Sequence, residues 1–181
     1  DMVSRGLGDV YKRQGYSTAD YTTWGYFLTF IFFLFLFSGA SAGSTSGGIK
    51  IVRIIILIKN SLLEFKRRLH PKAVIPVILN GSAISNHIIY NLLAFIFLYL
   101  FIFTLGSIIL SGLGLDFLSA ISAVASAVGN VGPGIASVGP SYSFDHVPDL
   151  GKWVLSLLML MGRLELFTVC LIFTPYFWKR I

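Results

Sequence analysis

The run GNVGPG, residues 129–134, combines residue types whose backbone can bind a cation. Glycine adopts backbone angles that other residues avoid, and Pro133 prevents a helix from continuing, so the chain must turn here. An extended stretch of Asn130, Val131 and Gly132 can present a row of carbonyl oxygens, which replace water around a dehydrated ion. The run therefore predicts a cation filter, although an ordinary Gly/Pro loop after an amphipathic helix has the same composition.

A short helix is expected directly before this run. Asp116 is a good N-cap residue, and about a dozen residues rich in Ala and Ser follow it, too few to cross a bilayer that needs roughly 20. Small residues let such a helix pack closely among other helices. Its C-terminal end carries partial negative charge and would point toward a cation.

The polar run SGASAGSTSGGIK, residues 38–50, interrupts an apolar tract at residues 26–58. The two apolar pieces hold about 12 and about 10 residues, so each reaches about half of the ~30 Å hydrocarbon core. We therefore expect a broken transmembrane helix. Irregular backbone at membrane depth is tolerated where it is buried in protein or lines a water-filled cavity, which places the loop at a pore. Close helix packing of the small-xxx-small type is the alternative.

Arg163 is placed about eleven residues into an apolar tract at residues 152–173. A lone arginine at that depth costs at least ~2.5 kcal/mol on insertion scales. Glu165 follows two residues later and points away from it on a helix. Arg163 therefore needs an aqueous cavity, or a buried ion pair with another helix.

The composition indicates a membrane protein. Of 181 residues, 55% are hydrophobic and 12% charged, and the mean hydropathy is +0.80. Residues 88–110 and 152–173 are uninterrupted candidate spans. Basic residues flank the apolar tracts: Arg53, Lys59, Lys66, Arg67, Arg68, Lys72, Lys179 and Arg180. By the positive-inside rule these flanks, the C-terminus included, are cytoplasmic, so we expect a multi-pass protein of the cell membrane and no nucleic-acid surface.

The sequence shows no constellation of residues for catalysis. The carboxylates Asp20, Asp116, Asp145 and Asp149 fall outside the predicted spans, and Cys170 is the single cysteine. The three histidines lack metal-ligand spacing. We expect neither an enzyme nor a resident metal site.

Five stretches occur in order from residue 15 onward: GYSTADYTTW, SGASAGSTSGGIKIVR, LHPKAV, GNVGPG and LMGRLELFTVCLIFTPYFW. Together they resemble the C-terminal half of the membrane subunits of the Trk/Ktr potassium-uptake family, in its TrkH-like branch. The resemblance implies an all-α transmembrane fold of K⁺-channel-like type. In it an outer helix, a re-entrant pore helix with its filter, and a second helix recur four times around one pore.

The resemblance also implies residue roles. Gly15 and Gly132 match the filter glycines of the third and fourth repeats, with Asn130 and Val131 before the latter and Pro133 after it. The implied gate consists of Gly39, Gly43, Ser44, Thr45, Gly47, Gly48 and Arg163. The transported ion would be K⁺, or also Na⁺, because Asn-Val-Gly lacks the strict K⁺-channel signature. No covalently bound cofactor is implied.

The implied partners are membrane lipid, the remaining repeats of a full-length subunit, a second copy in a homodimer, and a cytosolic nucleotide-binding regulatory subunit of the TrkA/KtrA type. Residues 15–80 would hold the end of the third repeat, with a filter remnant, the broken second helix with its intramembrane loop at 38–48 and a basic cytoplasmic segment. Residues 81–181 would hold the fourth repeat.

Residues 1–14 differ in character from the rest, being polar and aperiodic. Lys12, Arg13 and Gln14 stand where the family has a pore helix before Gly15, so we expect a non-native or disordered head. With fewer than two of four repeats, the chain is not expected to conduct alone. A secondary transporter with a broken-helix binding site, and a non-conducting membrane structural protein, are the alternative functions.

Overall fold

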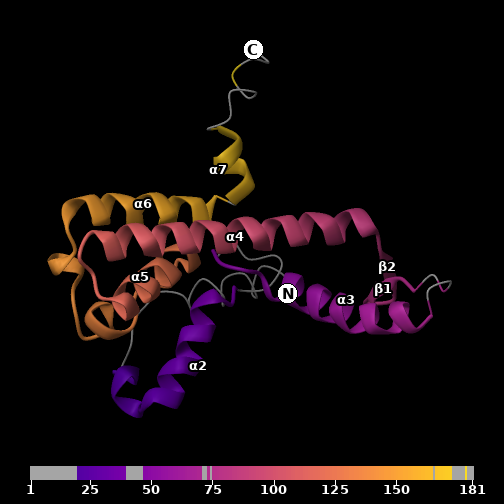
Figure 1. Ribbon diagram of the computed structural model, residues 1–181, viewed down its shortest axis with the longest axis horizontal. Coiled ribbons are helices and arrows are strands. Elements are labelled where there is room, and N and C mark those ends of the chain that lie inside the picture. Colours follow the sequence, from indigo (N-terminus) through magenta and orange to yellow (C-terminus); the bar gives the residue numbers. More distant parts are fainter. Residues whose placement is uncertain are drawn as a thin grey trace, which may run out of the picture.

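The computed structural model describes residues 20–39, 47–70, 73, 75–164, 166–172 and 178. In Figure 1, α4 runs along the molecule, with α6 on one side and α5, α3 and α2 on the other. The elements are η1 (Tyr21–Trp24), α2 (Tyr26–Phe37), α3 (Ile51–Leu69), β1 (Val77–Leu79), β2 (Ser82–Ile84), α4 (Asn86–Gly112), α5 (Phe117–Gly129), η2 (Ala136–Val138), η3 (Phe144–His146), α6 (Asp149–Arg163) and α7 (Leu166–Ile172).

Helix α4 matches the predicted span at residues 88–110. It has 27 residues, and within the described part of the chain it is the one helix long and apolar enough to cross a membrane. Most of its surface is left uncovered, because only 28% of its most apolar window is buried. The buried side includes Gly106, where an added Cβ would lie 2.9 Å from the Leu158 side chain of α6. This close approach fixes α6 against α4.

The prediction of one continuous helix over residues 152–173 was wrong. Helix α6 ends at Arg163 and α7 begins at Leu166, and α7 leaves the line of α6 at a sharp angle (Figure 1). Just before the bend, an added Cβ at Gly162 would collide with the carbonyl oxygen of Val128 in α5. Glycine both permits this contact and weakens the helix at the same point.

Helices α2 and α3 are separate, and they lie at a wide angle to each other in Figure 1. The N–H of Gly39 donates to the carbonyl of Ile49 at 2.6 Å, and the N–H of Ile49 donates to that of Phe37 at 3.2 Å. The described ends of the run between the two helices therefore lie side by side. Helix α3, with 19 residues, is longer than its predicted apolar piece, because its second half is amphipathic.

The described residues are mostly helical, which is consistent with the predicted all-α class, and a small β-hairpin adds to the helices. Strands β1 and β2 pair antiparallel, with Val77 opposite Ile84. Asn80 and Gly81 form the two-residue turn, with φ of 50° and 80°, as Asn-Gly turns in hairpins require. The predicted division between residues 80 and 81 falls within this turn and stays a prediction.

Helix α5 lies at the centre of the packing. Its residues from Ala123 to Gly129 are all buried. The apolar core joins α5 to α4 and α6 through residues that include Leu110, Val124, Val128, Leu155 and Leu158. Close van der Waals packing among these side chains holds the end of α5 in place.

Candidate functional site

The site begins at the ends of α5. The N–H of Ser119 donates to the Asp116 carboxylate at 3.2 Å, which confirms the predicted N-cap. Hydrogen bonding by Ser119, first through its side chain and then through its backbone N–H, lowers the pKa of Asp116. The helix has 13 residues and ends where Asn130 adopts φ 53° and ψ 44°. Asn tolerates this left-handed conformation, which closes a helix. The chain then turns back along the helix it has just left.

Three buried serines hold the returning chain. Ser119, Ser122 and Ser126, spaced three and four residues apart on one face of α5, are each no more than 2% exposed. We call them the serine row.

The serine row binds successive residues of the returning segment. Ser126 Oγ donates to the Gly132 carbonyl at 2.7 Å and accepts from the Gly132 N–H at 3.1 Å. Ser122 Oγ donates to the Ile135 carbonyl at 2.9 Å. The N–H of Ser137 donates to Ser119 Oγ at 3.1 Å. The segment therefore runs back along α5, held to it by serine hydroxyl groups, and leads into η2. Its backbone is not extended as predicted, because Asn130, Gly132 and Ala136 have positive φ angles.

The predicted filter residues lie together at the start of this segment. Gly132 is exposed and has φ 113°, while Asn130, Val131 and Pro133 are half-buried. The Gly132 carbonyl is already engaged by Ser126. In the described part of the chain, no donor reaches the carbonyl oxygens of Asn130, Val131 or Pro133. These oxygens can therefore accept an ion or water.

Residues close to the predicted third filter also reach this segment. Tyr21 donates its hydroxyl to the Gly134 carbonyl at 2.6 Å. Ser141 donates to the Asp20 carboxylate at 2.8 Å. Hydrogen bonds from Thr22, and then from Ser141, lower the pKa of Asp20. Gly15 itself lies outside the described residues.

Both flanks of the predicted gate loop lie at the C-terminal end of α5. An added Cβ at Gly129 would lie 2.5 Å from the Leu36 carbonyl oxygen, before the loop. An added Cβ at Gly47, near the end of the loop, would lie 2.8 Å from Asn130 Nδ2 and 3.1 Å from the Gly162 carbonyl oxygen. The loop thus starts and ends beside the residue that begins the predicted filter.

The other gate residues divide into two sets. Gly43, Ser44 and Thr45 lie outside the described residues. Gly39 is packed so tightly that an added Cβ would meet the Ile49 carbonyl oxygen at 2.6 Å, and Gly48 has φ 79°. Arg163 follows Gly162 at the end of α6 with an exposed side chain. The described residues offer Arg163 no ion-pair partner.

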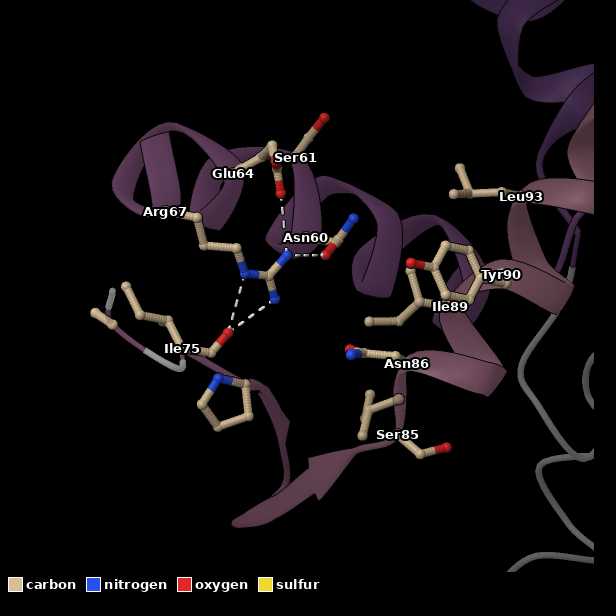
Figure 2. A pocket seen from close by; sticks show the side chains of 13 residues that line it. Asn60, Ser61, Glu64, Arg67, Ile75, Ser85, Asn86, Ile89, Tyr90 and Leu93 are labelled. Atoms are coloured by element: carbon tan, nitrogen blue, oxygen red, sulfur yellow. Dashed lines mark hydrogen bonds and ion pairs between the residues drawn. The ribbon is translucent and has the colours of Figure 1, made fainter. Parts of the chain in front are cut away.

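A second candidate is a cavity of about 720 Å³ between α3, the hairpin and the start of α4 (Figure 2). Arg67 lies on its wall and donates from Nε and Nη2 to the Ile75 carbonyl, at 3.1 and 2.8 Å. Its Nη1 donates to Asn60 and Glu64, at 2.9 and 3.1 Å. Because its donors and charge are already matched, Arg67 braces the chain before β1 against α3 and is not an open anion site.

The serine row was missed in the sequence, where these serines were interpreted only as small packing residues. Their spacing on one face of a short helix, followed by a glycine-containing turn, is a signal that could have identified them. The hydrogen bond from the Asn130 side chain to Met159, near the end of α6, had no such signal in the sequence, because it joins residues 29 positions apart.

Known proteins resemble the chain over most of its length. It is 39% identical over 91% of its length to the Trk system potassium uptake protein TrkH of Vibrio parahaemolyticus, and 37% identical over 92% to that of Halomonas elongata. Each match covers 34% of the relative, so the chain spans about a third of the length of the curated relatives it matches. The crystal structure of the potassium transporter TrkH from Vibrio parahaemolyticus superposes with a TM-score of 0.83, at 38% identity, over 93% of this chain and 36% of that one. The model of the TrkH family, described as cation transport protein, matches residues 11–180. The chain belongs to the TrkH family of membrane cation transport proteins.

Proposed function

We propose that this chain forms part of the ion path of a potassium uptake subunit, with residues 130–133 as an ion-binding stretch. One observation carries the proposal. The serine row fixes the returning segment at Gly132, while the carbonyl oxygens of Asn130 and Val131 accept no hydrogen bond from the described part of the chain. Free carbonyls beside the negative end of a short helix suit a dehydrated cation. The names of the relatives favour K⁺ as the ion, with Na⁺ as a second candidate.

The loop between α2 and α3, together with Arg163, is the proposed gate of this path. Supporting this, Leu36 before the loop and Gly47 near its end both lie at the end of α5. Arg163 follows directly on Gly162, which packs against Gly47 and Val128. A positive charge and a movable loop below a carbonyl filter would together resist the passage of cations. In this proposal α2 and α3 are the halves of one broken transmembrane helix.

The proposed whole is a full-length subunit in which further repeats complete the pore. It is multi-pass, has a cytoplasmic C-terminus, forms a homodimer and binds a cytosolic nucleotide-binding regulatory subunit. The basic end of α3, with Lys66, Arg67 and Arg68 in its last turn, supports the cytoplasmic placement of that end. Gly15 is the proposed filter glycine of the third repeat.

The test is ion flux through the purified full-length subunit in liposomes. We expect K⁺ to move passively down an imposed gradient, faster than Na⁺, and the flux to depend on the regulatory partner. Accumulation of K⁺ against its gradient, driven by a second ion, would instead support a secondary transporter. Absence of any flux with correctly inserted protein would leave a structural role and contradict the proposal.

A further inference from the structure

Two hydrogen bonds fasten the start of η1 to the segment that follows the predicted filter. Tyr21 donates its hydroxyl to the Gly134 carbonyl at 2.6 Å, across 113 positions of the sequence. Ser141 donates to the Asp20 carboxylate at 2.8 Å, across 121 positions. Both bonds join the same two segments, and they start from neighbouring residues of the first segment. We call these four residues the clasp.

The Tyr21 ring is packed into the core independently of its hydroxyl. It is 8% exposed and stacks on Phe32 of α2, with ring centroids 4.7 Å apart and ring planes 8° apart. It also belongs to a buried cluster that includes Ala125 of α5 and Ile135 of the returning segment. A phenylalanine ring would fill the same place. What the tyrosine adds is therefore the hydrogen bond to the Gly134 carbonyl.

The backbone of Gly134 is held at both of its polar groups. Its N–H donates to the Val138 carbonyl at 2.7 Å, and its carbonyl accepts from Tyr21. The peptide group that carries this N–H also carries the Pro133 carbonyl, and a peptide group is planar. Holding Gly134 therefore restricts the direction of the Pro133 carbonyl, while the serine row holds the residue before Pro133.

We propose that the clasp, with Tyr21 as its positioning residue, sets the direction of the Pro133 carbonyl and thereby contributes to discrimination between K⁺ and Na⁺. The inference rests on the proposed function. Selectivity depends on the size of the site or on the field of the coordinating carbonyls, and both change when a carbonyl turns. Tyr21 follows Gly15, the proposed filter glycine of the third repeat, by six residues. Through the clasp, one proposed repeat thus supports the filter of the next.

The first test removes a single oxygen atom from the full-length subunit. Tyr21→Phe deletes the hydroxyl and keeps the ring that stacks on Phe32. Tyr142→Phe is the matched control, because Tyr142 lies next to the clasp residue Ser141 and its side chain is 63% exposed. Losing one neutral hydrogen bond should lower the K⁺/Na⁺ flux ratio in liposomes about twofold to tenfold in Tyr21→Phe. Tyr142→Phe should leave the ratio unchanged at equal amounts of inserted protein.

The second test breaks the other bond of the clasp. Ser141→Ala should lower the flux ratio less than Tyr21→Phe does, because its bond is exposed and water can replace it. The two changes should combine non-additively, since both bonds join the same segments. Ser143→Ala is the control, because Ser143 donates to the Asp145 carboxylate at 2.7 Å within its own stretch. Independent effects of Ser141→Ala and Tyr21→Phe would contradict the clasp.

Ion binding gives a readout that does not require transport. An ion that binds the folded protein raises its unfolding temperature by mass action. K⁺ should therefore stabilise the purified wild-type subunit more than the same concentration of Na⁺. This difference between the two salts should shrink in Tyr21→Phe and persist in Tyr142→Phe. A side chain that only stabilises the fold would lower the unfolding temperature equally in both salts, which would contradict the positioning role.

The outcomes separate the inference from the proposed function. If correctly inserted wild-type protein carries no K⁺, the proposed function fails. If the wild type carries K⁺ but does not distinguish it from Na⁺, the inference fails. If the wild type selects K⁺ and Tyr21→Phe keeps both the flux ratio and the difference between the salts, the clasp is wrong and the proposed function stands. Loss of folded protein in Tyr21→Phe with an unchanged flux ratio would leave Tyr21 a structural role alone and overturn the inference.

Discussion

Ser126 Oγ makes two hydrogen bonds to the backbone of Gly132, donating to its carbonyl at 2.7 Å and accepting from its N–H at 3.1 Å. Ser126 is 2% exposed, so no water replaces it readily. Because both the N–H and the carbonyl of Gly132 are held, the two peptide groups that flank this residue cannot rotate freely. The neighbouring carbonyls are thereby held in one orientation, which an ion-binding row requires.

Ser126→Ala should loosen this orientation. The substitution removes both hydrogen bonds that Ser126 makes to the backbone of Gly132, each of which contributes about 0.5–1.5 kcal/mol. We expect the K⁺/Na⁺ flux ratio of the full-length subunit to fall, with membrane insertion preserved. Ser156→Ala is the control, because Ser156 makes a comparable bond to the Lys152 carbonyl, at 2.8 Å, on the exposed face of α6. Equal selectivity in both variants would show that the serine row only fills space.

Gly132→Val should abolish cation uptake. Gly132 has φ 113°, a conformation that a β-branched residue adopts only under strain of about 1–3 kcal/mol. Relief of that strain would turn a carbonyl away from its present direction. Gly114→Val is the matched control, since Gly114 has φ 100° and open space around it but lies between α4 and α5. The measurement is cation uptake by equal amounts of inserted protein. Retained uptake in Gly132→Val would show that the GNVGPG run is only a turn and does not bind the ion.

How far the sequence predicts this molecule depends on the range of the interactions. Helix α4 and the Asp116 cap follow from local patterns, and both were predicted. The hairpin had a local signal too, Asn80 before Gly81 between apolar residues, which went unused. The bend after Arg163 has no local signal strong enough, because Gly162 acts through its contact with Val128, a residue 34 positions earlier. Long-range backbone contacts of this kind require the folded chain.

Arg67→Lys should weaken the hairpin without changing charge. Arg67 reaches Ile75, Asn60 and Glu64 at once through its planar guanidinium, whereas a lysine ammonium is a single point with a different geometry. We expect a loss of about 1–2 kcal/mol of local stability, seen as faster amide exchange in β1 and β2. Arg68→Lys, at an exposed position of the same helix turn, should show no change. Unaltered exchange in Arg67→Lys would contradict the bracing role.

Asp20 should make the region of the proposed filter sensitive to acid and not to alkali. Hydrogen bonds from Thr22 and Ser141 lower the pKa of Asp20 below its ordinary value of 3.8. A group with a lowered folded pKa stabilises the fold above its unfolded pKa, and this contribution is lost as the pH falls through the folded pKa. The contribution of Asp20 to the thermal unfolding temperature should therefore be constant from about pH 8 to 5, and it should be lost below about pH 4. Asp20→Asn should reduce the fall in unfolding temperature at low pH. An unchanged fall at low pH in this variant would count against the role of Asp20.

Arg163→Ala should raise resting ion flux through the full-length subunit and weaken its dependence on the regulatory partner. Two unit charges 4 Å apart repel by about 4 kcal/mol at an effective dielectric constant of 20, and water screening lowers this value. Deleting part of the loop between α2 and α3 should have a similar effect, because the steric part of the barrier is removed. Arg68→Ala, which removes an exposed arginine from α3, is the control for charge. Leu36, before the loop, lies at Gly129, and Gly47, near its end, lies beside Gly162. If both changes act on one constriction, as the proposed gate requires, they should combine non-additively. Flux that stays at the wild-type level in both variants, at normal protein amounts, would contradict the proposed gate. Loss of folded protein in Arg163→Ala would instead favour a buried ion pair.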